Sequence, residues 1–293
     1  MSSCKGCSPE EGGQQQQDTD ATVALQDQLI DSTLSKITYK IFVMSGKGGV
    51  GKSSVAVNIA AALAASGKRV GLMDVDIHGP SVPNLLGLKG PMEPTRGGLI
   101  APKQYNENLF VVSMDSLLQD QDQAVLWRGP MKHTAIRQFI ADVDWGELDF
   151  LVIDSPPGTG DEHMTVLKTI PDAFCLIVTT PQEISLADVR KAINFLQYAQ
   201  ANVLGVVENM SGLACPHCGE DISLFKKGGG MELAKKCALE FLGAIPLDPA
   251  TVVAADQGRP VVLLSEESPA KQAFTQLAQA VVQGVEGSLE GFS

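Results

Sequence analysis

A glycine-rich octapeptide, GKGGVGKS at residues 46–53, matches the phosphate-binding pattern G-x-x-x-x-G-K-[ST]. Glycines let backbone N–H groups converge on phosphate oxygens, because a Cβ would hold the chain away from them. Lys52 would neutralise charge on the β- and γ-phosphates, and Ser53 would place its hydroxyl on Mg²⁺. A glycine-rich turn that binds nothing is disfavoured, since a strand-like run precedes the motif and a helix-like run follows it. We predict a nucleotide site made of Gly46, Lys47, Gly48, Gly49, Val50, Gly51, Lys52, Ser53 and Ser54.

A second lysine, Lys47, occupies the first variable position of this loop. Its simplest interpretation is a solvated surface charge. A lysine held in the loop five residues before Lys52 is also well placed to reach a nucleotide on an apposed subunit. A cation supplied in trans in this way resembles an arginine finger. We therefore predict a catalytic role for Lys47 beside that of Lys52.

Carboxylates follow two apolar runs that are typical of buried strands. Asp74 and Asp76 end the first run, and Asp154 ends the second, ahead of the sequence SPPGTG. An aspartate at the carboxyl end of a parallel strand faces the ligand crevice of an open α/β sheet. Asp154 is predicted to join the Mg²⁺ shell, and Asp76 to orient or activate the attacking water. The alternative for Asp74 and Asp76 is a helix cap or a turn.

The sequence CPHCG places Cys215 and Cys218 in a metal-knuckle pattern, where proline fixes the approach and glycine opens the turn. Half of a zinc ribbon would need another C-x-x-C further along, and none follows. A thioredoxin-like pair should begin a helix after a strand, whereas this pair lies in a Gly/Pro-rich excursion. A cluster or metal shared across a two-fold axis would take two thiolates from each subunit. The count of two thiolates per chain favours this shared site. Zinc and an iron–sulfur cluster both remain open as its occupant, because both bind four thiolates.

Apolar runs alternate with helical periods along most of the chain. Several runs are continuously apolar, as in strands covered on both faces. The pattern predicts an α/β, doubly wound, mostly parallel sheet with a small cysteine-containing excursion. The phosphate motif at residues 46–53 assigns this sheet to the P-loop NTPase type. Strands are expected at 40–45, 69–74, 108–114, 149–154, 173–179 and 203–208, and helices at 53–65, 132–142, 185–199, 231–241 and 269–282. Residues 1–37 are expected to form a disordered or weakly helical tail, and 38–293 the ATPase domain, including the C-P-x-C segment 211–230.

Composition limits the class of protein and its partners. The chain has 22 Lys+Arg against 34 Asp+Glu, a formal net charge of −12, and 44% hydrophobic residues. It is apolar enough to bury a core, and its acidic balance disfavours binding to nucleic acid or to an anionic membrane. No apolar run approaches the roughly 18–20 residues that cross a bilayer. The N-terminus lacks the basic-then-apolar order of a signal peptide, so we expect a cytoplasmic protein.

These motifs together resemble a known family. Residues 46–53 resemble the deviant Walker A motif, with its signature lysine, of partitioning, cell-division and nitrogenase-iron-protein ATPases. Within that class, the chain resembles the Mrp/ApbC-type iron–sulfur cluster carrier ATPases from about residue 40 to residue 280. The segments that carry this resemblance are DVDIHGPS at 74–81, WRGPM at 127–131, DSPPGTGD at 154–161, ENMS at 208–211 and CPHC at 215–218.

The resemblance implies an ATPase that forms a homodimer around its nucleotide, with ATP and Mg²⁺ as cofactors. It also implies that Cys215 and Cys218 of both subunits hold a bridging 4Fe–4S cluster for delivery to apo-proteins. The implied partners are apo iron–sulfur proteins and cluster-assembly scaffold proteins. By the same resemblance, Asn209 would contact the adenine, with Pro246 and Asp248 nearby.

Two alternatives remain open from the sequence. A partitioning-type ATPase that binds DNA, a membrane or a protein partner, with structural zinc at the cysteine pair, would share the phosphate loop. Such proteins usually need a basic face or tail, whereas residues 285–293 are acidic. Cys4 and Cys7 offer only two thiols where some eukaryotic relatives carry four, so they form a partial ligand set or belong to a polar tail. Cys175 and Cys237 stand alone in apolar surroundings and are expected to act as small hydrophobic residues.

Overall fold

The computed structural model describes residues 23–76, 79–114, 129–214, 218, 220–222, 224 and 226–290. Its main sheet has eight strands in the order β10-β7-β6-β1-β5-β2-β4-β3. All neighbouring strands run parallel except β3, which pairs antiparallel with β4 at one edge. The strands are β1 (Ile37–Ser45), β2 (Val70–Asp74), β3 (Lys103–Gln104), β4 (Leu109–Ser113), β5 (Leu148–Asp154), β6 (Phe174–Thr179), β7 (Asn202–Glu208) and β10 (Phe241–Ala244).

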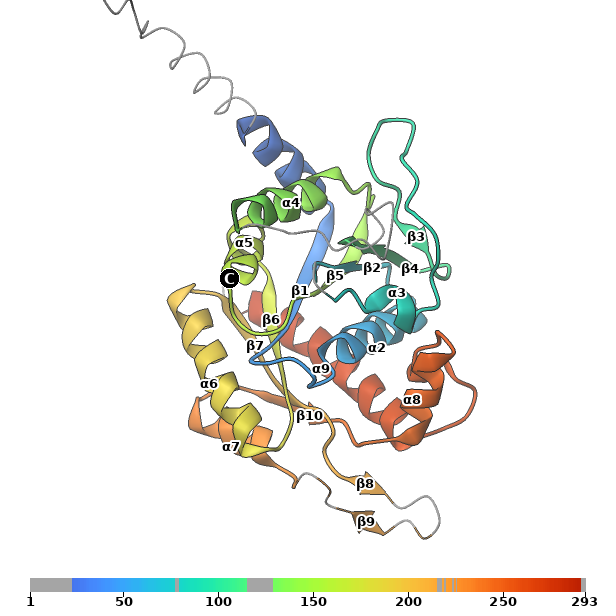
Figure 1. Cartoon of the computed structure of the whole chain (residues 1–293), viewed down its shortest axis with the longest axis vertical. Coiled ribbons are helices and arrows are strands. Elements are labelled where there is room, and N and C mark those ends of the chain that lie inside the picture. Colours follow the sequence, from blue (N-terminus) through green and yellow to red (C-terminus); the bar gives the residue numbers. More distant parts are fainter. Residues whose placement is uncertain are drawn as a thin grey trace, which may run out of the picture.

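Helices cover both faces of this sheet (Figure 1). On one face α2 (Lys52–Ala65) and α9 (Pro269–Glu290) pack side by side, with α3 (Val82–Leu85), α8 (Pro249–Asp256) and the short helix η2 (Val261–Leu263) beside them. The other face carries α4 (Gly129–Asp142), α5 (Asp161–Thr169), α6 (Glu183–Tyr198) and α7 (Gly229–Lys236). Among the described helices, none combines the length and the apolar character that a bilayer crossing requires.

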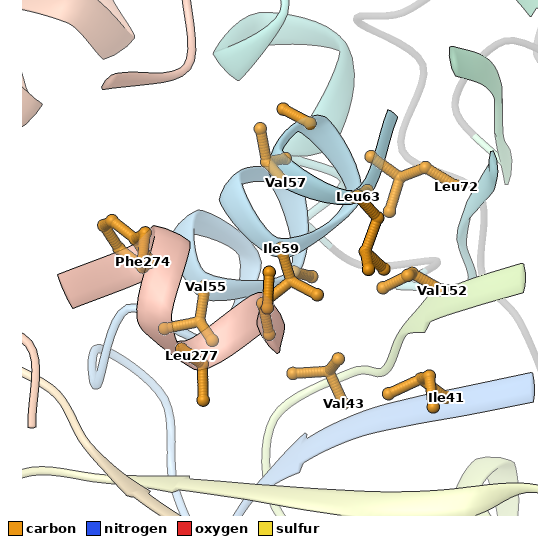
Figure 2. Packing of buried hydrophobic residues seen from close by; sticks show 14 of the residues in the cluster. Ile41, Val43, Val55, Val57, Ile59, Leu63, Leu72, Val152, Phe274 and Leu277 are labelled. Carbon is orange, nitrogen blue, oxygen red and sulfur yellow. The ribbon is translucent and has the colours of Figure 1, made fainter. Parts of the chain in front are cut away.

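The central strand shows why the sheet needs two layers of helices. Ile41 and Val43 of β1 point into the cluster under α2 and α9 (Figure 2), whereas Phe42 and Met44 point into the cluster on the opposite face. All four side chains are fully buried. Successive residues of a strand face opposite sides, so a continuously apolar strand must be covered on both. The predicted doubly wound, mostly parallel fold is confirmed.

Two predicted boundaries differ from the structure. The predicted helix at 231–241 ends early, because α7 stops at Lys236 and Ala238 adopts a left-handed conformation with φ 53°. The apolar residues that follow form the edge strand β10, which α9 covers. Helix α5 and helix α8 were not predicted.

The packed body also begins earlier than the expected boundary between residues 37 and 38. A helix over residues 23–34 precedes β1, and its Ile30 and Leu34 are buried in the same cluster as Phe42. Arg137 of α4 forms an ion pair with Asp27 of this helix. Residues 1–22, with Cys4 and Cys7, lie outside the described part of the chain.

Candidate functional site

The phosphate loop connects β1 to α2, as the motif requires. Gly49 and Gly51 both adopt left-handed backbone conformations, with φ 78° and 79°, which favour glycine. A Cβ on Gly51 would run into the side-chain amide of Asn209, and one on Gly46 would run into the backbone of Asp188. The loop borders a cleft of about 330 Å³ lined by Ser45, Lys47, Gly48, Gly49, Gly51, Lys52, Ser53, Ser54, Asp76, Ser81, Leu85 and Pro157.

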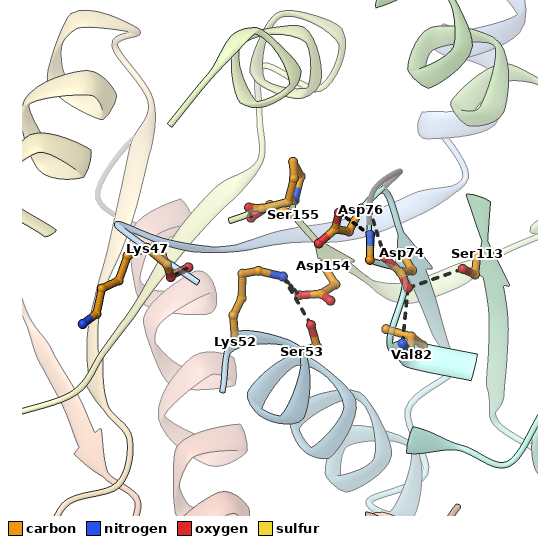
Figure 3. A network of polar contacts seen from close by, with 12 residues as sticks. Lys47, Lys52, Ser53, Asp74, Asp76, Val82, Ser113, Asp154 and Ser155 are labelled. Carbon is orange, nitrogen blue, oxygen red and sulfur yellow. Dashed lines mark hydrogen bonds and ion pairs between the residues drawn. The ribbon is translucent and has the colours of Figure 1, made fainter. Parts of the chain in front are cut away.

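At the start of α2, Lys52 reaches the carboxylate that ends β5. Its Nζ lies 2.5 Å from Oδ1 of Asp154 and 3.3 Å from Oγ of Ser53, and both charged side chains are buried (Figure 3). The second oxygen of Asp154, Oδ2, is buried and finds no hydrogen-bond partner among the described residues. Burial raises the pKa of Asp154, and the neighbouring Lys52 and Ser53 oppose that rise.

This arrangement fits a divalent cation bound with a nucleotide. An orphaned buried carboxylate oxygen is costly, and Mg²⁺ prefers such hard oxygen ligands together with substrate phosphates. Ser53 and Asp154 are the residues that would hold the ion, and this role stays a prediction for both. The glycines of the loop leave room for phosphate oxygens to meet the backbone amides.

Asp74 organises the loop after β2 rather than facing the cleft. Its Oδ1 accepts the N–H of Asp76 at 3.0 Å, and its Oδ2 accepts the N–H of Val82 at 3.2 Å and the hydroxyl of Ser113 at 3.3 Å. Burial, together with the charge of Asp154, raises the pKa of Asp74 to about 8. Asp74 therefore stabilises the turn after β2, which was the alternative role considered for it in the sequence.

Asp76 is the carboxylate of this pair that lines the cleft. Its backbone is fixed by the bond to Asp74, and its Oδ1 accepts the N–H of Gly79 at 3.2 Å. Figure 3 places it beside Asp74, near the end of β2. The position suits the predicted role toward the attacking water, which stays a prediction.

Lys47 leaves the phosphate loop in another direction. Figure 3 shows its side chain pointing away from Lys52 and Asp154. Its carbonyl accepts the hydroxyl of Ser45 at 2.9 Å, which fixes the loop backbone at this position. Within one chain Lys47 therefore does not duplicate Lys52.

The three residues predicted near the adenine lie on different elements. Asn209 follows β7, and its Nδ2 donates to the carbonyl of Val50 in the phosphate loop at 2.9 Å. The carboxylate of Asp248 caps α8 by accepting the N–H of Ala250 at 2.9 Å, and it reaches the N–H of Ala270 in α9 at 3.3 Å. Pro246 is half-buried between β10 and α8. Their adenine contacts stay predictions, whereas the bond from Asn209 to the loop is a new finding.

His163 was missed by the sequence prediction. It lies in the first turn of α5, 1% exposed, and its Nδ1 accepts the N–H of Gly160 at 3.2 Å. Its ring meets those of Phe42 and Phe195 edge-on. Burial lowers the pKa of His163 to about 4, so the ring is neutral near pH 7. His163 thereby holds the end of the loop that follows Asp154.

Two short strands flank the cysteine pair in the sequence. Strands β8 (Leu213–Ala214) and β9 (Asp221–Ile222) pair antiparallel and stand apart from the main sheet (Figure 1). Cys218 is exposed, whereas Cys215 lies outside the described residues. In the described part of the chain, no three His, Cys, Asp or Glu side chains gather into a metal site. Cys175 is fully buried, as expected of a small hydrophobic residue.

The parallel sheet, the glycine loop between β1 and α2 and the carboxylates at the strand ends define a P-loop nucleoside triphosphatase. The particular family follows from comparison with known proteins. Residues 36–282 match the ParA family model described as NUBPL iron-transfer P-loop NTPase, so the chain belongs to that family. The resemblance to iron–sulfur cluster carrier ATPases is confirmed.

Individual relatives agree with this family. The chain is 46% identical over 274 residues to the iron-sulfur cluster carrier protein of Methanocaldococcus jannaschii, covering 93% of this chain and 94% of the relative. It is 43% identical to the human cytosolic Fe-S cluster assembly factor NUBP2, covering 87% and 96% respectively.

Solved structures confirm the fold. A nucleotide-binding protein from Archaeoglobus fulgidus, in complex with ADP, superposes with a TM-score of 0.71 at 39% identity, covering 83% of this chain and 98% of that one. The cell-division ATPase MinD of Pyrococcus furiosus superposes with a TM-score of 0.61 at 25% identity, covering 84% and 98% respectively.

Proposed function

We propose that this protein is an ATP-hydrolysing carrier of iron–sulfur clusters that acts as a homodimer in the cytoplasm. The carrier function is supported by relatives of about the same length that are named iron-sulfur cluster carrier protein and cytosolic Fe-S cluster assembly factor. The structural observation that carries the proposal is that the contact with the phosphate loop and the cysteine-bearing segment both begin at the end of β7. After β7 ends, Asn209 contacts the phosphate loop. The chain then continues directly into β8 and β9, which flank the cysteine pair in the sequence.

The nucleotide half of the function follows from the cleft. The loop amides and Lys52 bind the phosphates of ATP, and Ser53 and Asp154 hold Mg²⁺, which neutralises charge on the phosphate oxygens. Asp76, which lines the same cleft, orients the attacking water. Lys47, which points away from its own cleft, reaches the nucleotide of the partner subunit and stabilises the charge of the transition state.

The cluster is the cargo of this carrier. A 4Fe–4S cluster usually takes four thiolates, and each chain supplies two in C-P-x-C. Cys215 and Cys218 of both subunits therefore complete one bridging site on the two-fold axis of the dimer. The dimer receives the cluster from scaffold proteins and passes it to apo iron–sulfur proteins.

Anaerobic reconstitution tests the proposal, with iron quantified and the mass of the holo-protein measured by native mass spectrometry. We expect about four irons per two chains, because one cluster is shared. Cys215→Ser and Cys218→Ser should each abolish the cluster, since each change removes two ligands from a symmetric site. Cys237→Ser is the matched control and should retain it.

A cluster on a monomer, or an intact cluster in both cysteine variants, would contradict the shared site. One zinc ion per dimer with no iron would instead assign the cysteine pair a structural role. Calorimetry with ADP should give the same nucleotide affinity in all three variants, because the cysteines lie outside the phosphate motifs of the sequence.

A further inference from the structure

A buried carboxylate at the end of β7 gathers three donors. Glu208 is fully buried, and its Oε1 accepts the hydroxyl of Ser211 at 2.5 Å and the N–H of Gly228 at 2.9 Å. Its Oε2 accepts the N–H of Gly230 at 2.6 Å. Both oxygens are thus engaged, and removing such an acceptor leaves buried donors unsatisfied.

These donors come from the two ends of the cysteine-bearing segment 211–230. Ser211 stands just before β8, and Gly228 and Gly230 stand at the start of α7. A Cβ on Gly230 would lie 3.0 Å from Cβ of Glu208, so the close approach requires glycine. Gly228 has φ 81°, which also favours glycine. One carboxylate therefore joins the entry of the segment to its exit.

The next residue makes the opposite connection. Asn209 donates from Nδ2 to the carbonyl of Val50, and its amide abuts Gly51 in the phosphate loop. The backbone of Glu208 and Asn209 is held by hydrogen bonds to the chain on either side of β7. The N–H of Asn209 donates to the carbonyl of Thr179 at 2.8 Å, and the carbonyl of Glu208 accepts the N–H of Ile245 at 2.8 Å. Adjacent residues thus contact the nucleotide loop and the cysteine segment.

We infer that Glu208 is a positioning residue that links the segment carrying Cys215 and Cys218 to the phosphate loop, so that nucleotide in the loop changes the mobility of the segment. The inference rests on the proposed function for the importance of these cysteines. Phosphate bound at the loop shifts the Val50 carbonyl to which Asn209 is anchored. The rigid junction between Asn209 and Glu208 passes that shift to Ser211, Gly228 and Gly230.

A purely structural role for Glu208 is the competing explanation. A carboxylate at the N-terminus of a helix stabilises its first turn, and Glu208 does this for α7. Capping alone would stabilise α7 equally with and without nucleotide. The nucleotide dependence of segment mobility therefore separates the two roles.

Amide hydrogen exchange of the full-length protein, with and without saturating Mg·ADP, tests the inference. The peptides that cover 211–230 are followed in the wild type, Glu208→Gln, Ser211→Ala and the control Glu240→Gln, which makes the same change in an exposed side chain. We expect ADP to slow exchange of the segment at least about fivefold in the wild type and in the control. In Glu208→Gln the ADP effect should disappear.

ADP affinity, measured by calorimetry, should fall in Glu208→Gln by no more than that same factor, because coupling between two sites is reciprocal. Cys175 reports folding in each sample, since its thiol is buried in β6 and reacts with iodoacetamide only when the sheet opens. If Glu208→Gln exposes Cys175, Ser211→Ala decides the question. Loss of at least half of the ADP effect in that variant supports the link.

An equal ADP effect in the wild type and in the folded variants would overturn the inference, and so would its absence from the wild type. Failure of the proposed function has a different signature. In that case the wild type shows the ADP effect, yet anaerobic reconstitution yields no cluster bridging two chains.

Discussion

Nζ of Lys52 lies 2.5 Å from Oδ1 of Asp154, while Oδ2 of the same carboxylate finds no partner in the described part of the chain. A buried ion pair seldom stabilises a fold by itself, because desolvation offsets the attraction between the charges. One that leaves an acceptor unsatisfied is harder still to explain by stability. The pair is better explained as a site prepared for phosphate and Mg²⁺, in which Lys52 turns to the phosphates and Asp154 to the cation.

The two lysines of the loop should separate binding from hydrolysis. Lys52→Ala should abolish nucleotide binding, because it removes the cation that faces the phosphates. Lys47→Ala should bind ADP and ATP normally but hydrolyse ATP about a thousandfold more slowly, the scale of an arginine finger. Calorimetry gives the affinities, and phosphate release gives the rate.

Thermal unfolding without nucleotide should be recorded for both variants, because Lys52→Ala also leaves Asp154 without its partner. Lys47→Ala should unfold like the wild type. Equal losses of nucleotide affinity in the two variants would contradict the role of Lys47 in trans.

The two carboxylates of the cleft should also differ. Asp76→Asn should retain ATP and Mg²⁺ but lose turnover by about 10²–10⁴, the usual contribution of a group that handles a proton or positions water. Asp154→Asn should weaken nucleotide binding only when Mg²⁺ is present. Titrations with and without Mg²⁺ check this difference. Wild-type turnover in Asp76→Asn would exclude its role toward the water.

Gly51 offers a steric test of the loop. Gly51→Ala should lower ADP affinity by about tenfold or more, because its Cβ would displace the Asn209 amide or lift the loop. Gly67→Ala is the matched control. Gly67 also has a left-handed backbone, with φ 88°, so adding a Cβ there should cost about 1 kcal/mol of stability. The added Cβ would meet no atom within 4 Å, so nucleotide affinity should stay unchanged. Equal affinities in both variants would show that the close approach is unimportant.

Local patterns predicted the parts of the site that lie within one stretch of sequence. The phosphate loop and Asp154 could be identified because a strand, a loop and a helix follow one another directly. The contact of Asn209 with Val50 could not, since 159 residues separate the two and no periodicity records the contact. The donors of Glu208 are likewise brought together only by the folded chain.

The boundaries of elements were harder to predict for a related reason. Phe241 and Leu242 continue the apolar period of α7, yet the left-handed Ala238 ends the helix. The residues from Phe241 onward form β10, the edge strand that pairs with β7. His163 went unrecognised because α5 was not predicted. A histidine in the first turn after a glycine-rich loop is the signal that was available.

His163 should make the stability of the protein fall in mild acid. Its pKa is about 4 in the folded protein, against 6.5 for the free side chain, because burial opposes the charge. Protonation would also place a proton on Nδ1, the atom that accepts the N–H of Gly160. A lowered pKa means that the unfolded chain binds the proton first, so stability present above pH 6.5 is lost as the pH falls toward 4.

The change that tests this is His163→Gln, because a glutamine in the same helix position can still reach back to the Gly160 amide but does not titrate. From about pH 7 to about pH 5 the wild type should lose about 2 kcal/mol more unfolding free energy than the variant. Urea unfolding at both pH values measures that difference. The two proteins must be compared, because other groups titrate over the same range. The pKa of Asp74 is raised to about 8, so Asp74 adds stability as the pH falls, whereas His163 removes it. Parallel pH profiles for the wild type and His163→Gln would mean that the pKa of His163 is the same in the folded and unfolded protein, and would contradict the lowered pKa.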